Sequence, residues 1–299
     1  GFNGAASASL YRILHSGGSL HKRGYRVPTV HKAAMKESLA AGLLMEAGYD
    51  KLIAAAKEDG LPAVLVDPMA GSGTLCVEAA LIASDYAPGL MRMNKFRDED
   101  SDKNPHQVPP VVRWKGADRK QWRDLVIEAR DRATSGTKWM KTPNANDPSR
   151  PNCVIKGNEM NPSAAVLAMD NIDKAGFGDC ITLDEGDCVN WDLGGGEDET
   201  SPARIVVPGR TLVVSNPPWG LRLTEDIEES WLSLKSFLRE QCNSSEAWVL
   251  SGSKSSTRFL RMKKSRSVVI KTADEDLRWI QYHVFKKKPA HVTKDSFGA

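Results

Sequence analysis

The chain has 299 residues, of which 40% are hydrophobic and 26% charged, an ordinary composition for a globular protein with a sizeable core. No apolar run approaches the roughly 20 residues that a membrane-spanning helix needs. The first residues lack the charged segment and apolar stretch that predict a signal peptide. The composition therefore argues against a transmembrane helix and a secretory leader.

The five cysteines are scattered, without a CxxC pair or a neighbouring His. They are Cys76, Cys153, Cys180, Cys188 and Cys242. This usage predicts no metal site and favours reduced thiols inside the cell. It leaves the cytoplasm and an organelle, such as a chloroplast or mitochondrion, equally open.

The positive charges are unevenly distributed, although the net charge is only +3. An acid-free tract over residues 254–271 carries seven cations, and His21, Lys22, Arg23 and Arg26 cluster near the N-terminus. The seven are Lys254, Arg258, Arg261, Lys263, Lys264, Arg266 and Lys271. Such clusters are often only solvated surface, but several in one chain favour a polyanionic partner such as RNA.

The first elements predicted are a hairpin over residues 9–27, around a Ser-Gly-Gly turn, and a helix over residues 31–47 with apolar residues at helical spacing. The apolar run LPAVLVD then predicts a strand buried on both faces, which ends at Asp67. A Gly-rich turn and the helical TLCVEAALIASDYA follow. These three segments predict a β-loop-α unit.

Residues 91–150 interrupt this rhythm, because they are rich in Pro, Asp, Asn, Lys and Ser. We interpret them as a partly mobile insertion with one helix over residues 119–133. The rhythm resumes with strands predicted at CVIKGNE, CITLDEGD, GRTLVVSNPP and EAWVLSG, separated by helices. The segments RSVVIKT and RWIQYHVFKK predict a closing antiparallel pair.

Alternating strands and helices predict an α/β, Rossmann-like fold with a mostly parallel sheet and helices on both faces. We expect residues 1–50 to form an N-terminal unit packed on a catalytic domain of residues 51–299, which contains the insertion. In such sheets ligands bind beyond the carboxyl ends of the strands. The residues that follow each predicted strand are therefore the candidate site.

The turn DPMAGSGT after the first predicted strand begins with Asp67 and admits three interpretations. A phosphate-binding P-loop requires Lys where Thr74 stands, and a dinucleotide fingerprint requires Gly where Cys76 stands. The third is S-adenosylmethionine, whose ammonium suits a carboxylate such as Asp67 beside a glycine turn. A simple strand-to-helix turn is the structural alternative.

Acidic residues also follow the next two predicted strands. Glu159 is placed to accept from both ribose hydroxyls of an adenosine, because an ionised carboxylate is an acceptor only. Asp187 is placed to accept from the adenine amine, with the Cys188 N–H serving a ring nitrogen. The alternatives are a helix-dipole contact for Glu159 and an ordinary turn for Asp187.

The segment VVSNPPWG after the fourth predicted strand brings two acceptors together. Asn216 supplies a side-chain carbonyl, and Pro217, which lacks an N–H, supplies a backbone carbonyl that the sheet does not use. Gripping both hydrogens of a planar exocyclic amine favours the pyramidal geometry in which its lone pair attacks. Trp219 offers a face on which the target ring stacks. An Asx-type turn is the structural alternative.

With these segments, the sequence resembles the S-adenosylmethionine-dependent N-methyltransferases that carry the motif [N/D]PP[Y/F/W]. It is most similar to the methyltransferase domain of bacterial large-subunit rRNA guanine-N2 methyltransferases and their THUMP-linked tRNA relatives. The carrying segments are SLHKRGYR, AAMKESLAAGLL, LVDPMAGSGTLCVEAALIASDYAPGL and VVSNPPWGLRL. Residues 91–150 show no match.

The resemblance implies a seven-strand class I methyltransferase fold and a set of contacts. Donor contacts are implied for Asp67, Met69, Gly71, Gly73, Thr74, Glu159, Asp187 and Cys188, and target-amine contacts for Asn216, Pro217 and Trp219. Arg23, Arg26, Lys36 and Glu37 are weaker candidates packed over the donor site. Lys263 and Lys264 join Arg23 and Arg26 as expected RNA contacts. Relatives have an RNA-binding THUMP domain, which would lie upstream of residue 9 or be replaced by a partner.

Three functions remain open from the sequence. The first is transfer of a methyl group to guanine N2 in structured RNA, with rRNA favoured over tRNA. The second keeps the chemistry but changes the acceptor to a protein glutamine or a DNA adenine, because the same grip suits any planar amine. The third is a non-catalytic module that binds the donor or RNA.

Overall fold

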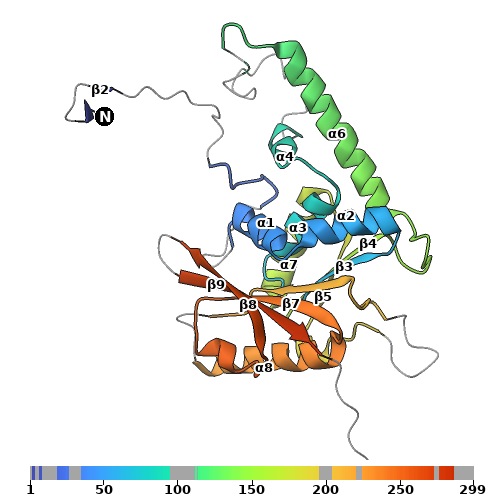
Figure 1. The fold of residues 1–299 in the computed structure, drawn as a ribbon, viewed down its shortest axis with the longest axis vertical. Coiled ribbons are helices and arrows are strands. Elements are labelled where there is room, and N and C mark those ends of the chain that lie inside the picture. The colour runs from blue at the N-terminus through green and yellow to red at the C-terminus, as the bar shows by residue number, and fades with distance from the viewer. Residues whose placement is uncertain are drawn as a thin grey trace, which may run out of the picture.

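A seven-stranded sheet forms the centre of the protein (Figure 1). The computed structural model describes residues 2–3, 7–8, 19–26, 35–94, 112, 114–194, 204–219, 224–272 and 276–285. The sheet has the order β5-β4-β3-β6-β7-β9-β8. Its strands are β3 (Ala63–Asp67), β4 (Cys153–Glu159), β5 (Ile181–Glu185), β6 (Thr211–Ser215), β7 (Ser245–Ser251), β8 (Lys264–Lys271) and β9 (Asp276–Val284).

The sheet is parallel except at one strand. β3 pairs in parallel with β4 and β6, β4 pairs in parallel with β5, and β6 pairs in parallel with β7. β9 pairs antiparallel with both β7 and β8. The predicted mostly parallel sheet with an antiparallel closing pair is therefore confirmed.

Helices cover both faces of this sheet (Figure 1). One face carries α1 (Glu37–Glu46), α2 (Tyr49–Asp59), α3 (Thr74–Ala83) and α7 (Pro162–Ala175), and the other carries α8 (Thr224–Gln241). None of the helices in the described part of the chain has the length and apolarity to span a bilayer.

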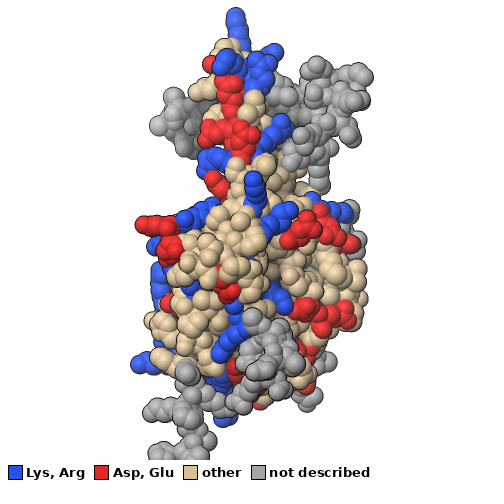
Figure 2. Space-filling view, turned by 90° about the vertical axis from the view of Figure 1, so that its right-hand side faces the viewer, with Lys and Arg blue, Asp and Glu red and all other residues tan. Residues whose placement is uncertain are grey.

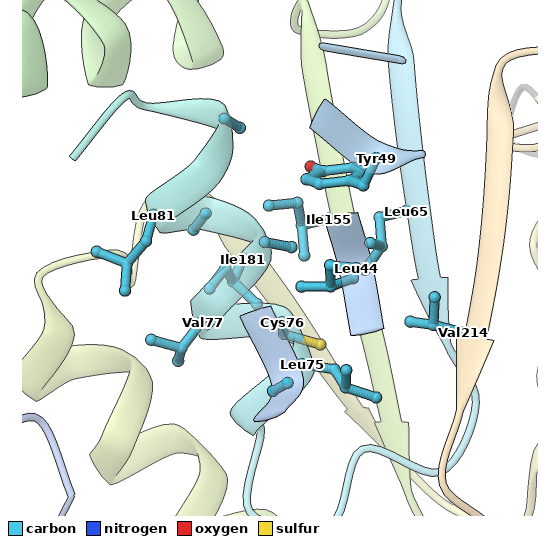
Figure 3. Packing of buried hydrophobic residues seen from close by; sticks show 14 of the residues in the cluster. Leu44, Tyr49, Leu65, Leu75, Cys76, Val77, Leu81, Ile155, Ile181 and Val214 are labelled. Atoms are coloured by element: carbon cyan, nitrogen blue, oxygen red, sulfur yellow. The ribbon is translucent and has the colours of Figure 1, made fainter. Parts of the chain in front are cut away.

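The core consists of two clusters, one on each face, because successive strand residues point to opposite sides. Leu65 of β3 and Val214 of β6 belong to the cluster under α1, α2 and α3, whereas Val64 and Val66 pack toward α8. Figure 3 shows the first cluster, where Leu65 and its neighbours on β4 and β6 point toward the helices. The strands are thus buried on both faces, as their continuous apolar runs predict.

The N-terminal elements differ from those predicted. Residues 9–18 and 27 of the predicted hairpin lie outside the described residues, and residues 19–26 form turns without a strand. The predicted helix over residues 31–47 begins only at Glu37, because Lys36 is extended with φ −63° and ψ 137°. Separately, β1 (Phe2–Asn3) pairs with β2 (Ser7–Ala8).

A second helix, α2, was not predicted. It begins after Gly48 and ends at Gly60, and both glycines adopt the left-handed conformation that stops a helix. The division predicted at residue 50 falls inside this helix and stays a prediction.

Among the described residues, α4 (Gly89–Asn94) overlaps the start of the region interpreted as an insertion, and α6 (Arg119–Lys141) lies within it. α6 extends beyond the predicted 119–133, and Ala133, Gly136 and Met140 bury its last turns against the body. The prediction ended too early because Gly136 reads as a helix breaker in isolation.

Candidate methyltransferase site

The candidate site lies beyond the carboxyl ends of four neighbouring strands. In the spatial order β5-β4-β3-β6, these strands lead to Asp187, Glu159, Asp67 and Asn216. β3 has β4 on one side and β6 on the other, so the chain reverses its direction of progress across the sheet between β3 and β6. Such a topological switch point opens a crevice where α/β proteins bind ligands. The structure thus places the predicted acids and the amide along one edge of the sheet.

The glycine loop after β3 is shaped by two left-handed residues. Gly71 has φ 56° and Gly73 has φ 73°, a region that residues with a Cβ rarely adopt. A Cβ on Gly73 would also lie 3.2 Å from Cβ of Ala168 on α7. The loop therefore turns tightly into α3, whose first turn contains no acidic side chain and offers N–H groups at the site.

Asp67 is the most buried acid of the site, with 1% of its surface exposed. Its Oδ1 accepts from the Met69 N–H at 3.2 Å, and its buried Oδ2 has no hydrogen-bond partner among the described residues. Burial is the main cause that raises the pKa of Asp67 from 3.8 to about 8; the Met69 N–H lowers it, and the nearby charge of Glu159 adds to the rise. An unpaired buried carboxylate oxygen fits the ammonium of an amino acid.

Glu159 ends β4 and braces the glycine loop. Its Oε2 accepts from the Gly71 N–H at 2.7 Å, and its Oε1 accepts from the Asn161 N–H at 2.9 Å. Each carboxylate oxygen retains a further lone pair for a ligand hydroxyl. Next to it, the side chain of Met160 is 62% exposed, and Val189 is 39% exposed beside the predicted adenine contacts. These exposed apolar residues, which the sequence analysis missed, lie next to the predicted donor contacts.

Asp187 follows β5 and is bonded on both oxygens. Oδ1 accepts from the Val189 N–H at 3.0 Å, and Oδ2 accepts from the Ser233 hydroxyl of α8 at 3.2 Å. The neighbouring Cys188 is buried, and burial raises the pKa of its thiol to about 12. The thiol therefore stays protonated, which leaves the Cys188 backbone as the group available for recognition.

Two buried amides, also missed from the sequence, hold the donor loops together. Asn158 Nδ2 donates to the Gly186 carbonyl at 2.8 Å and to the Pro68 carbonyl at 3.4 Å. Asn171 Nδ2 donates to the Ser72 carbonyl at 2.9 Å from α7. For Asn158, the only signal in the sequence was its position as a polar residue inside a predicted strand.

Asn216 and Trp219 contact each other. The indole Nε1 donates to Asn216 Oδ1 at 3.0 Å, and Trp231 Nε1 donates to the Pro218 carbonyl at 2.9 Å. The Trp219 ring packs over Gly252, where an added Cβ would lie 2.6 Å from a ring carbon. Pro217 is buried. The turn is therefore fixed at both aromatic residues, and the face of Trp219 toward Gly252 is covered.

The N-terminal arginines lie in ion pairs and not on an open surface. Arg23 Nε is 3.4 Å from Glu78 Oε1, and Arg26 Nε is 3.4 Å from Glu37 Oε1. Arg26 also donates to Thr74 Oγ1 at 3.0 Å. Their side chains are only 15% and 14% exposed. These contacts tie residues 19–26 to α1 and to the start of α3, next to the glycine loop.

The other expected RNA contacts are exposed. Lys263 precedes β8, one of the two edge strands of the sheet, and Lys264 begins it. Both side chains face solvent, whereas Arg266 of the same strand pairs with Glu46. Lys36 is also exposed, and Met69 lies partly buried beside the loop.

Two solved structures with a similar fold have names that describe them as methylases. A possible methylase from Clostridium difficile 630 matches with a TM-score of 0.62 and 24% identity, covering 92% of this chain and 58% of that one. A predicted N6-adenine-specific DNA methylase from Listeria monocytogenes matches with a TM-score of 0.61 and 26% identity, covering 90% and 56%. The implied seven-strand class I methyltransferase fold is confirmed.

Curated relatives are similar over most of this chain. It is 32% identical over 253 residues to the ribosomal RNA large subunit methyltransferase K/L of Allochromatium vinosum, covering 84% of this chain and 28% of that protein. It is 35% identical over 240 residues to the protein of that name from Pseudomonas aeruginosa, covering 79% and 27%. The chain thus spans less than a third of the length of these relatives.

A family profile matches the part of the chain that contains the candidate site. It is described as the RMKL-like methyltransferase domain, and it matches residues 23–281. The segment includes the glycine loop, the strand-end acids and the Asn-Pro-Pro-Trp turn. The chain therefore belongs to the RMKL-like methyltransferase domain family.

Proposed function

We propose that this protein transfers a methyl group from S-adenosylmethionine to the exocyclic N2 amine of a guanosine in structured RNA. Ribosomal RNA is the favoured substrate, because curated relatives of that name match most of the chain. One observation carries the proposal: Asp67, with an unpaired buried oxygen, and Asn216 follow adjacent parallel strands at the switch point. An anion for the donor and an acceptor for the amine are thus on neighbouring strands.

The residues divide into three groups along the sheet edge. Asp67 and the loop N–H groups would hold the amino-acid end of S-adenosylmethionine. Glu159 would accept from its ribose, and Asp187 with the Cys188 backbone would contact its adenine. When bound, this donor supplies a methyl group on a positively charged sulfur that is a good leaving group.

Asn216 and Pro217 would act on the target amine. Asn216 Oδ1 has two lone pairs, of which the Trp219 N–H uses one, so the second is available to a substrate N–H. The Pro217 carbonyl would accept the other hydrogen. Holding both hydrogens aligns the nitrogen lone pair, and positioning supplies much of the acceleration without a strong base.

The substrate question is decided by labelled methyl transfer. The protein is incubated with radiolabelled S-adenosylmethionine and, separately, with rRNA, tRNA, DNA and a protein extract from cells that lack it. We expect label in RNA that ribonuclease removes and that chromatography of nucleosides identifies as N2-methylguanosine. Label in DNA adenine or protein glutamine would replace the proposed acceptor. Donor binding without transfer to any of the four would indicate a non-catalytic module.

The setting of the reaction is also proposed. All five cysteines carry free thiols, which suits a reducing compartment, either the cytoplasm or an organelle. Because the relatives are more than three times as long, we propose that a further RNA-binding domain or a partner protein assists this domain.

A further inference from the structure

The long helix α6 projects from the body as an arm (Figure 1). Its 23 residues span about 34 Å at 1.5 Å per residue. Only Ala133, Gly136 and Met140 are buried, and all three lie in its C-terminal half. No residue in the first half of the helix is buried by the part of the chain that the structure describes.

The arm is held rigidly at its base. A Cβ on Gly136 would lie 2.0 Å from the carbonyl oxygen of Ser84, so the helix backbone packs directly on the end of α3. Arg132 forms a two-point ion pair with Asp85, at 2.8 and 2.9 Å. The opposite end of α3 carries the glycine loop, so one short helix joins the arm to the donor site at a fixed distance.

One side of the arm carries cations and no acid. At 100° per residue, Arg119, Arg123, Arg130 and Lys141 fall within about 40° of one another around the helix. The acidic residues of the helix, Asp124, Glu128 and Asp131, begin about 80° further round. In Figure 2, acidic side chains gather along the side of the arm toward the viewer, with Lys and Arg at its tip and flanks.

Three of these four cations have no ion pair within the described residues. Arg119, Arg123 and Arg130 form no salt bridge there, whereas Lys141 pairs with Asp179 at 3.6 Å. The buried Nε of Arg130 has no acceptor there. Unpaired guanidinium groups on a fixed helix retain their full hydrogen-bonding capacity, which suits phosphate oxygens.

The base of this side is hollowed. A cavity of about 660 Å³ lies between α6 and the segment that contains Tyr86 and Leu90. The helix lines it with Arg130, Thr134, Thr137, Lys138 and Lys141. Cations and hydroxyls therefore surround a space within the size range of ligand sites, at the end of α3 away from the glycine loop.

We propose that this acid-free side of α6 binds the sugar-phosphate backbone of structured RNA at a distance from the methylated nucleotide. The inference rests on the proposed function and assigns to the arm a part of substrate capture. Charge complementarity selects RNA over other occupants, because a row of three unpaired arginines spaced along about 16 Å of helix matches a chain of phosphates. An acidic protein surface is the competing occupant, and the test separates the two.

The test compares two double variants of the full chain with equal charge loss. The first is Arg119→Gln with Arg123→Gln, on the proposed surface. The control is Lys51→Gln with Lys174→Gln, two exposed lysines on α2 and α7. Binding of a fluorescein-labelled RNA duplex is followed by anisotropy in roughly 50 to 200 mM potassium chloride.

We expect the arm variant to bind the duplex at least about tenfold more weakly, with a salt slope shallower by about 1.8, which corresponds to two lost phosphate contacts. The control should match the wild type, and calorimetry should show the same S-adenosylhomocysteine affinity in all three proteins. Equal losses in both variants, or none in either, would overturn the inference even if the wild type methylates RNA.

The remaining outcomes are also decisive. A wild type that methylates RNA but does not bind the duplex, with rates unchanged in the arm variant, overturns the arm alone. A wild type that neither binds nor methylates any RNA overturns the proposed function, and the arm inference with it. In that case, binding of an acidic protein lost only in the arm variant would identify the competing occupant.

Discussion

The indole N–H of Trp219 donates to the side-chain oxygen of Asn216 at 3.0 Å, within the turn that follows β6. The amide is therefore oriented before any substrate arrives, with its second lone pair directed elsewhere. The ring that supplies the N–H is itself held over Gly252. Trp219 thus has a positioning part in addition to its predicted stacking part.

Replacing Asn216 with Ala should remove the acceptor for the target amine and leave the donor loops intact. We expect methyl transfer to slow by about 100-fold, by analogy with the loss of one hydrogen-bonding group that acts in the transition state. Single-turnover transfer and donor calorimetry measure the two quantities separately. A large fall in donor affinity would mean that Asn216 belongs to the donor site.

Replacing Trp219 with Phe should keep the aromatic surface and remove only the N–H. We expect about a tenfold fall in kcat, since a lost hydrogen bond of about 1.4 kcal/mol no longer fixes the amide. The donor Kd should not change. The sharper comparison is the double variant with Asn216→Ala: if Trp219 acts through Asn216, Phe at 219 adds nothing further, and an additive loss contradicts this role.

Asp67 should make donor binding depend on pH. Burial raises its pKa to about 8, so the folded protein keeps a proton that the unfolded chain loses near 3.8. The folded state binds more protons across this window, and its stability therefore falls as pH rises from about 4 to about 8. A bound ammonium favours the ionised carboxylate, so donor affinity should rise with pH in the upper part of the window.

Calorimetry in two buffers of different ionisation enthalpy measures the linked proton. At pH 7 we expect wild-type protein to release a proton on binding S-adenosylhomocysteine, and Asp67→Asn protein to bind more weakly without that release. Proton uptake by the wild type, or identical release by both proteins, would contradict the assignment of Asp67 to the ammonium.

The two buried amides should have separable effects. Asn158 donates to the carbonyls of Pro68 and Gly186, on two different loops, whereas Asn171 donates to the carbonyl of Ser72 in the glycine loop. We expect Asn158→Ala to weaken binding of both S-adenosylhomocysteine and adenosine several-fold, because it loosens the loops on both sides. Asn171→Ala should weaken the former and spare adenosine. Equal effects of the two variants on adenosine would show that the loops move as one unit.

Arg23 should contribute to stability more than to RNA binding. Its guanidinium faces Glu78, which is 2% exposed and also accepts from the Tyr25 hydroxyl at 3.2 Å. Burial raises the pKa of Glu78 to about 7, so without Arg23 this carboxyl would take up a proton. The cost is therefore smaller than for a pair that stays ionised, about 2 kcal/mol. We therefore expect Arg23→Gln to lower the free energy of unfolding by that amount, measured with urea. Unchanged stability with a loss of RNA affinity would favour the RNA contact predicted from the sequence.

The sequence predicted the central elements because their signals are local. Continuous apolar runs identified β3 and β6, and the glycines of the loop after Asp67 marked the turn into α3. The acids at the strand ends follow from the same pattern once parallel topology is assumed. This part of the site depends on chain order alone, and it could be read without coordinates.

The remaining features depend on tertiary contacts. The sequence analysis missed α2, although its buried residues Tyr49, Ile53 and Ala56 recur at helical spacing. Its ends are defined by the conformations of Gly48 and Gly60. The last turns of α6 contain Gly136, which is unfavourable in an isolated helix and necessary where the helix meets Ser84. The sequence around Arg23 is typical of a surface cation, because its partner Glu78 lies far away in the chain. The ion pair between them could therefore not be predicted from neighbouring residues.

The position of β9 also determines when the sheet can finish folding during synthesis. β9 follows every other described strand in the sequence, yet it lies between β7 and β8, and Trp279 stacks on Trp248 of β7 at 5.7 Å. A nascent chain that ends before residue 276 leaves the edge of β7 and a large indole uncovered. Closure of this half of the sheet must therefore wait until β9 has left the ribosome, and until then the unpaired edge of β7 is exposed to aggregation.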